Sequence, residues 1–186
     1  MPLEAASQET LLQVARGSIS AGLGGQAYTP EADDPRLREP RATFVTLHRQ
    51  SRLRGCIGTL EAVRPLLQDV SHNARAAAFH DPRFTPVAAT ELTELLIEIS
   101  VLSPPQAMRA DSRATLLQNL KPGGQGLILQ EGARRATFLP AVWESLPDPG
   151  DFLDQLLHKA GLPPEYWSGT LRFFSYETES FGEQGI

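Results

Sequence analysis

The chain has few of the residues on which several common protein classes depend. Its 186 residues include one cysteine, Cys56, so no internal disulfide and no thiolate zinc cage is expected. The four histidines contain no H-x-x-x-H pair, so no metal site is predicted. No apolar run approaches the ~18 residues of a membrane span, and the start "MPLEAASQET" lacks the basic and apolar parts of a secretion signal. We therefore expect a cytoplasmic protein that makes no contact with a membrane.

The chain also lacks an excess of positive charge. It has 17 Lys and Arg against 22 Asp and Glu, a net charge of −5, so nucleic acid is not expected as the main partner. One segment departs from this average, because residues 36–54 hold six arginines and one acid, Glu39. This Arg-rich rim is either solvated surface or an anion-attracting mouth near Cys56. Its members are Arg36, Arg38, Arg41, Arg49, Arg52 and Arg54.

Hydrophobic periodicity predicts an α+β fold around an antiparallel or mixed sheet. Helices are predicted over residues 7–22, 65–79, 112–120, 140–146 and 151–160. Strands are predicted over 41–48, 53–61, 95–101, two segments of 126–138, and 170–180. The first two strands form one predicted hairpin, and the two segments of 126–138 form the other. In the second helix, His72, Asn73 and Arg75 are expected to point outward. Residues 1–186 are predicted to form a single domain, which a boundary near 105–125 would divide into two lobes sharing one core.

The segment "SRLRGCIGTLEA", residues 51–62, contains the only thiol. Residues two apart in a strand share a face, so Arg54 and Cys56 are predicted to project together. A neighbouring guanidinium favours the thiolate form that performs nucleophilic or redox chemistry. Gly55 and Gly58 lack side chains and allow another backbone or a ligand to approach closely.

A purely structural interpretation of this segment stands beside the functional one. A free cysteine is often buried, a strand glycine often marks a bulge, and Arg54 can point to solvent. A nucleophilic cysteine also needs a base. The sequence assigns none, and the candidates are His48, His72 and His80.

A second polar group follows in "AAFHDPRFTPV", residues 77–87. Asp81 and Pro82 predict a turn, after which Arg83 emerges beside Phe84 and can stack or bind a carboxylate or phosphate. The alternative is a turn in which Asp81 and Arg83 simply bond each other. The glycines of "KPGGQGLIL" lack the spacing of a phosphate loop and lead into a strand, so no cofactor is expected.

Five segments, in order along nearly the whole chain, resemble the AMMECR family, named after the chromosomal region of Alport syndrome, midface hypoplasia and elliptocytosis. Its prokaryotic members are called AmmeMemoRadiSam system protein A. The resemblance implies a two-lobed α+β fold with an Arg-Gly-Cys-Ile-Gly segment along a functional cleft. It also implies a Memo-type protein and a radical S-adenosylmethionine protein as partners, and it brings no settled chemistry. The segments are "LRGCIG" (53–58), "AAFHDPRFTPV" (77–87), "IEISVLSPP" (97–105), "GLIL…GARRATFLPAVWE" (126–144) and "FLDQLLHKAGLPPEYW" (152–167).

His80 departs from the family pattern, in which a basic or other polar residue is common at that position, and this weakens a Cys56–His80 pair. The leading hypothesis is a cleft that binds an anionic small molecule or a modified side chain of a partner. Whether the chain is an enzyme stays open; if it is, Cys56 is the nucleophile or redox centre and Arg54 its electrostatic activator. The expected ligand-binding residues are Gly55, Ile57, Gly58, Asp81, Arg83 and Phe84.

Two other functions compete with this hypothesis. One is a non-catalytic recognition module in which the glycine-flanked strand docks a partner protein. The other, ranked last, is RNA binding through the Arg-rich rim, which the overall charge opposes.

Overall fold

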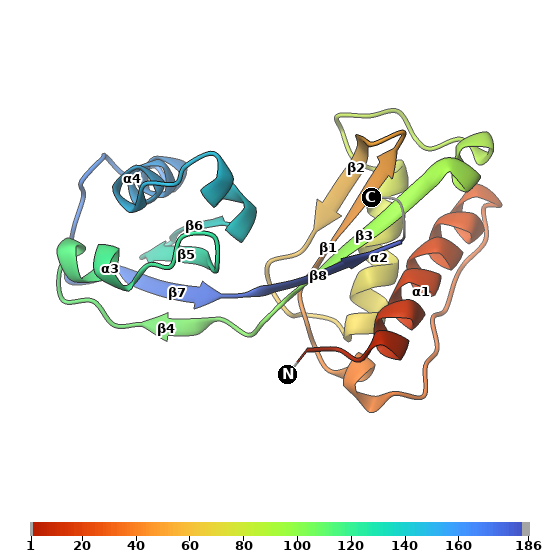
Figure 1. Cartoon of the computed structure of the whole chain (residues 1–186), viewed down its shortest axis with the longest axis horizontal. Helices are drawn as coiled ribbons and strands as arrows, with labels where there is room; N and C mark the ends of the chain where they lie inside the picture. The colour runs from red at the N-terminus through yellow and green to blue at the C-terminus, as the bar shows by residue number, and fades with distance from the viewer. Residues whose placement is uncertain (1, 184–186) are drawn as a thin grey trace. The chain divides into compact units, whose positions relative to one another are not determined.

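Two units, each built on its own sheet, make up residues 2–183, which a computed structural model describes (Figure 1). The first unit comprises the chain up to Leu102 together with the residues from Glu179 onward, and the second is Ser103–Thr178. The chain therefore passes between the units after Leu102 and returns after Thr178, whereas the sequence pointed to one boundary near 105–125. The helices and the two four-stranded sheets confirm the α+β class.

The first unit combines one antiparallel sheet with two long helices and two short 3-10 helices. The helices are α1 (Ala5–Leu23), η1 (Pro35–Arg38), α2 (Leu66–Phe79) and η2 (Ala89–Glu94). The strands are β1 (Thr43–Arg49), β2 (Arg52–Gly58), β3 (Leu95–Leu102) and β8 (Thr178–Gly182). Their spatial order, β2-β1-β3-β8, places β2 at an edge of the sheet.

The two long helices cover one face of this sheet (Figure 1). Alternate residues of β1 and β3 face the helices, as strand geometry requires. The fully buried ones include Val45, Leu47, Ile97 and Ile99. The residues between them, such as Thr46 and Glu98, lie on the opposite face and are only half-buried. We call this side of the sheet, which lies opposite the two long helices of the first unit, the uncovered face.

Asn73 of α2 contradicts the prediction that it points outward, because it is fully buried. Its Nδ2 donates to the carbonyl oxygen of Thr43 and to Oδ2 of Asp69, each at 3.0 Å. Asp69 is also fully buried and accepts from the N–H and the hydroxyl of Thr43. Hydrophobic periodicity assigns polar residues to solvent, and it fails here because the polar partners of Asn73 are themselves inside the unit.

The second unit contains the sheet β4-β7-β5-β6 and its own core. Its strands are β4 (Gln106–Met108), β5 (Gly126–Glu131), β6 (Arg134–Phe138) and β7 (Arg172–Tyr176). Its helices are α3 (Arg113–Asn119), the 3-10 helix η3 (Pro140–Glu144) and α4 (Pro149–Lys159). The predicted hairpin of β5 and β6 is confirmed, and the rings of Trp143 and Phe152 stack in the core with centroids 3.7 Å apart.

The strand predicted over residues 170–180 is in fact two strands, and each belongs to a different sheet. The break falls at Glu177, whose carbonyl oxygen accepts from the N–H of Ser103 at 2.8 Å. The N–H of Glu177 donates to the Ser103 hydroxyl at 3.0 Å, so neither backbone group of Glu177 is left for a ladder. A sequence window cannot show that a continuous β pattern changes sheets.

No helix among residues 2–183 combines the length and the apolar composition that crossing a bilayer would require.

Candidate functional site

Cys56 lies on β2, the second strand of the hairpin predicted with β1. A β-bulge interrupts this hairpin, because Leu47 pairs with Gly55 while His48 pairs with Leu53. Arg54 is therefore the extra residue of β2, opposite no single residue of β1. The regular alternation from which Arg54 and Cys56 were predicted to share a face is broken at this point.

Arg54 is bound to Glu91 of η2. Its Nε and NH2 donate to the two carboxylate oxygens at 2.9 and 3.0 Å, and its NH1 donates to the carbonyl oxygen of Thr85 at 3.0 Å. Glu91 also accepts from Arg49 NH1 at 3.0 Å. Arg49 is two residues from the core residue Leu47 on β1, so both lie on the helix-covered face. Because Glu91 binds both arginines, the guanidinium of Arg54 lies toward that face as well. Arg54 thus bonds Glu91 and not the thiol, and the guanidinium that interacts with the Cys56 side chain is that of Arg83.

The hydrogen bonds from Arg54 and from the backbone N–H of Ala88, together with the charges of Arg54 and Arg49, lower the pKa of Glu91 to about 2. The side chains of Arg54 and Glu91 are 14% and 12% exposed, so this ion pair is largely shielded from water. Sequence analysis missed Glu91, because nothing local in "ATELTE" indicates partners about forty residues earlier in the chain.

The Cys56 thiol faces the uncovered side of the sheet. Cys56 lies opposite Thr46 of β1, and the Thr46 hydroxyl donates to Sγ at 3.3 Å. His48 follows two residues later on the same face, with Nε2 3.5 Å from Oε2 of Glu98 on β3. Glu98 is in turn the β3 partner of Thr46. We call Cys56, Thr46, His48 and Glu98 the polar row.

The other two candidate histidines, His72 on α2 and His80 at its C-cap, are exposed. His80 ends that helix, and its backbone N–H donates to the carbonyl oxygen of Ala76. His72 lines a cavity on the outer side of α2. His48 is therefore the histidine that shares the face of the thiol.

The turn from Asp81 to Arg83 closes the outer edge of β2 at Cys56. Asp81 Oδ2 accepts the backbone N–H of Cys56 at 2.9 Å, and Arg83 NH2 donates to the Cys56 carbonyl oxygen at 3.2 Å. Asp81 also accepts from Nε and NH2 of Arg83 at 3.0 and 2.7 Å. These hydrogen bonds hold the pKa of Asp81 well below its usual range, and the side-chain bonds from Arg83 are the largest cause. The pair occupies backbone groups that an added strand would otherwise use.

The ring of Phe84 lies near two guanidinium groups, one from the predicted activator Arg54 and one from the predicted ligand-binding residue Arg83. The guanidinium carbons of Arg83 and Arg54 are 5.5 and 6.0 Å from its ring centroid. At these distances the ring helps to hold both side chains in place.

The glycines of β2 give room to other parts of the first unit. A Cβ on Gly55 would overlap the carbonyl oxygen of Ala77 in α2, and a Cβ on Gly58 would overlap the ring of Phe44. Ile57 packs against the core of the unit. Of the two approaches that the sequence left open, the structure has the backbone of α2 at Gly55.

The Arg-rich rim carries less free positive charge than its composition suggests. Four of its six arginines form ion pairs with five carboxylates, four of which lie outside residues 36–54. The count along the sequence therefore overstated the local charge. The pairs are Arg36 with Glu4 and Asp34, Arg41 with Glu39, Arg49 with Glu91 and Glu94, and Arg54 with Glu91.

Large apolar side chains are exposed on both sides of residues 54–58. Leu53, Leu60 and Val63 are 42%, 37% and 66% exposed. Tyr28 is the fourth large hydrophobic residue that is exposed among residues 2–183, and it lies on a different segment.

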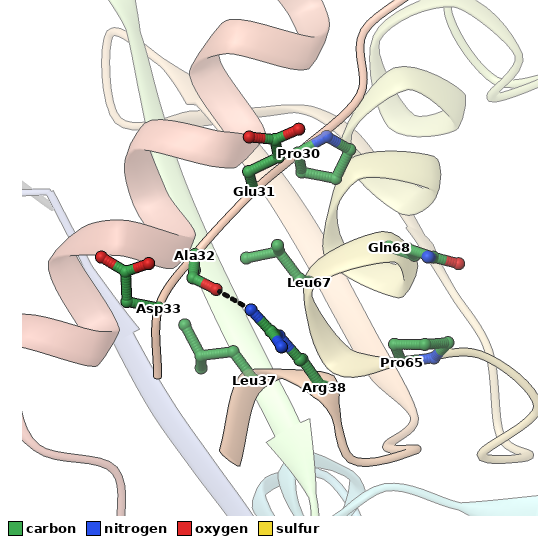
Figure 2. A pocket seen from close by; sticks show the side chains of 9 residues that line it. All are labelled: Pro30, Glu31, Ala32, Asp33, Leu37, Arg38, Pro65, Leu67 and Gln68. Carbon is green, nitrogen blue, oxygen red and sulfur yellow. Dashed lines mark hydrogen bonds between the residues drawn. The ribbon is translucent and has the colours of Figure 1, made fainter. Parts of the chain in front are cut away.

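Two cavities open on the helical side of the first unit. One, of about 460 Å³, lies between α2 and residues 30–38, and Figure 2 shows Arg38 NH2 bonded to the Ala32 carbonyl oxygen at its wall. The other, of about 390 Å³, adjoins it through Pro30 and Gln68. Neither is lined by residues 53–58 or 81–84. Within the described part of the chain, no three His, Cys, Asp or Glu side chains gather as metal ligands would.

Comparison with known proteins gives one consistent family. The AMMECR1 family model matches residues 12–181. A protein of Methanococcus aeolicus is 38% identical over 176 residues, covering 92% of this chain and 88% of the relative. A protein of Methanothermobacter thermautotrophicus is 36% identical over 192 residues, covering 99% and 98%. The crystal structure of an uncharacterised protein from Pyrococcus horikoshii has a TM-score of 0.81 and 34% identity, covering 95% of this chain and 91% of that one.

Proposed function

The chain belongs to the AMMECR1 family, and from this premise and the geometry around β2 we propose that it is a non-catalytic recognition module that docks a partner protein. The docking surface consists of β2 and the segment after it, with Leu53, Leu60 and Val63 as its apolar contacts. The single observation that carries this proposal is that these three exposed side chains flank residues 54–58.

The state of the cations favours this function over the capture of an anionic ligand. Arg54 and Arg83 are each in direct contact with a carboxylate, Glu91 and Asp81, at 2.9 and 2.7 Å. An incoming anion would have to compete with these carboxylates, and the charge it meets is largely neutralised. An apolar partner surface meets no such competition.

The rigidity of the surface also supports recognition. Cys56 is held through both backbone groups by Asp81 and Arg83, and Gly55 lies against α2. A surface that is fixed before binding loses little conformational freedom when a partner docks. The partner contacts side chains in this arrangement, because the edge of β2 at Cys56 is already hydrogen-bonded.

The partner that we propose is the Memo-type protein that the family resemblance implies. The test measures binding of the purified Memo-type protein from the same genome by calorimetry. Leu60→Ser and Val63→Ser should each weaken binding about tenfold or more, since each removes a desolvated apolar contact. Tyr28→Ser is the matched control, because Tyr28 is as exposed as Leu60, at 37%, but lies on another segment. Equal effects at all three positions, or binding of the radical S-adenosylmethionine protein instead, would overturn this assignment.

A second candidate function, thiol chemistry, is supported by the polar row. The Thr46 hydroxyl donates to Cys56 Sγ, and the pair of His48 and Glu98 lies on the same face. A neighbouring base is the usual companion of a nucleophilic cysteine, and His48, whose buried Nε2 makes no hydrogen bond within residues 2–183, is the candidate base. Alkylation by iodoacetamide, in which the sulfur displaces iodide, should then be faster for Cys56 than for glutathione at pH 7, and slower in Thr46→Val. A rate no faster than that of glutathione would rule this candidate out.

Cys56→Ser separates the two candidates. The recognition module keeps its affinity for the partner when the sulfur is replaced by a hydroxyl. A thiol-dependent reaction loses its activity completely with the same change.

A further inference from the structure

The cavity of about 390 Å³ on the outer side of α2 has an unusual charge for this acidic chain. Arg64, His72 and Arg75 line it, and no Asp or Glu does. Tyr28, Ser71 and Gln68 add hydroxyl and amide groups to the same wall. Its walls therefore offer hydrogen-bond donors and positive charge together.

The two arginines differ in how their charge is balanced. Arg64 NH1 donates at 2.8 Å to Oδ1 of Asp69, which is fully buried and does not line the cavity. Arg75 NH1 donates at 3.1 Å to the carbonyl oxygen of Gln26, and among residues 2–183 no carboxylate forms an ion pair with it. The charge of Arg75 is thus uncompensated in a chain whose net charge is −5.

Both guanidinium groups are fixed by one nitrogen and keep others for a ligand. In each arginine NH1 is the anchored nitrogen, and Nε and NH2 remain as donors. A planar fork with adjacent N–H groups suits the oxygens of a phosphate. Because the anchors set the positions of the side chains before binding, less freedom is lost when an anion enters.

We propose that this cavity binds the phosphate group of a small phosphate monoester. Its volume of about 390 Å³ lies in the range of small-molecule sites. The assignment is independent of the partner surface, since no residue of 53–63 lines the cavity.

The neighbouring cavity limits the rest of the ligand. It adjoins the first through Pro30 and Gln68, and two carboxylates, Glu31 and Asp33, line it together with one guanidinium, Arg38, so that the lining is negative on balance, as Figure 2 shows. A second anionic group would be repelled there, whereas hydroxyl groups can donate hydrogen bonds to the carboxylates. The organic part of the ligand therefore carries no second anionic group, as in a polyol or sugar phosphate.

The experiment measures binding of glycerol 3-phosphate, 2-phosphoglycolate and malonate to the full chain by calorimetry at constant ionic strength. Glycerol 3-phosphate should bind saturably, and malonate about tenfold more weakly or not at all. 2-Phosphoglycolate should bind more weakly than glycerol 3-phosphate, because its carboxylate meets Glu31 and Asp33. Equal affinity for malonate would overturn the choice of phosphate, and tighter binding of 2-phosphoglycolate would overturn the exclusion of a second anionic group.

Arg75→Gln should weaken binding of glycerol 3-phosphate about tenfold or more, as expected for the loss of a charge-assisted hydrogen bond. Arg52→Gln is the matched control, since Arg52 is an exposed arginine of the same unit that lies outside the cavity. Should Arg75→Gln fail to fold, Gln68→Glu places a negative charge in the exposed wall and should weaken binding similarly. No saturable binding by the wild type, or equal losses in the Arg75 and Arg52 variants, would overturn the site.

Discussion

Replacing Asp81 by Asn tests how firmly the turn holds β2. The carboxylate of Asp81 accepts four hydrogen bonds, from the N–H of Cys56 at 2.9 Å and from N, Nε and NH2 of Arg83 at 3.1, 3.0 and 2.7 Å. An amide keeps one acceptor oxygen and turns two donors toward the others. At least one of the two sets of partners is then left without an acceptor.

The magnitude follows from the burial of the two partners. Asp81 is 4% exposed, so an unpaired donor beside it costs about 1–3 kcal/mol. The Arg83 side chain is 53% exposed and can be solvated instead, which places the loss near the middle of that range, at about 2 kcal/mol. For a chain of this size this corresponds to a fall in Tm of roughly 4–8 °C.

Two signals locate the effect. Both tryptophans, Trp143 and Trp167, lie in the second unit, so their fluorescence reports that unit, whereas the lone thiol reports β2 in the first. Asp81→Asn should lower the urea midpoint measured by circular dichroism and speed the labelling of Cys56 by a disulfide reagent. Asp33→Asn, at an exposed aspartate of the same unit, should change neither.

The pH dependence provides a second check on the same pair. Because folding lowers the pKa of Asp81, the ionised pair stabilises the fold at neutral pH, and this contribution is lost as the pH falls below the ordinary value of about 4. The difference between wild type and Asp81→Asn should therefore shrink in acid. An unchanged midpoint together with an unchanged labelling rate at neutral pH would refute the role given to the turn.

Three further changes probe the frame around β2 and the interior of the first unit. Folding lowers the pKa of Glu91 from 4.5 to about 2, so the wild type should lose stability as the pH falls through this interval. Glu91→Gln should be less stable than the wild type at pH 7 and should lose less stability in acid. Parallel acid-unfolding curves of the two proteins would contradict this. Gly55→Ala should destabilise the chain by about 1–3 kcal/mol in urea unfolding, because its Cβ would overlap the backbone of α2, whereas Gly169→Ala, with nothing within 4 Å, should be neutral; equal effects would refute the close approach. Asn73→Ala should cost about 2 kcal/mol by removing two buried hydrogen bonds of about 1 kcal/mol each, and a wild-type midpoint would show that these hydrogen bonds contribute nothing.

The elements of the fold were predictable where their signals are local. The β1–β2 and β5–β6 hairpins follow from alternation and turn residues, and the predicted helix over 65–79 appears as α2, Leu66–Phe79. The split between β7 and β8 was not predictable, since both strands have the same pattern and differ only in their neighbours.

The candidate site was predictable as a place but not as a geometry. Cys56, Asp81 and Arg83 were identified from two separate segments, and the structure brings them within hydrogen-bond distance. The bulge at Arg54 was hidden, because a register shift depends on how two strands meet. Glu91 was hidden for a similar reason, since its partners come from another part of the chain.

The interruption of the first unit by the second has a consequence for synthesis on the ribosome. Chains emerge N-terminus first, so α1, α2 and three strands of the first sheet are available long before β8. Until then the outer edge of β3 has no strand beside it, and the N–H of Ile97 lacks the Glu183 carboxylate that it reaches at 2.9 Å in the finished fold. Nascent chains that have not yet delivered residues 178–183 therefore present an open strand edge, and slow translation of the second unit should prolong their exposure to aggregation.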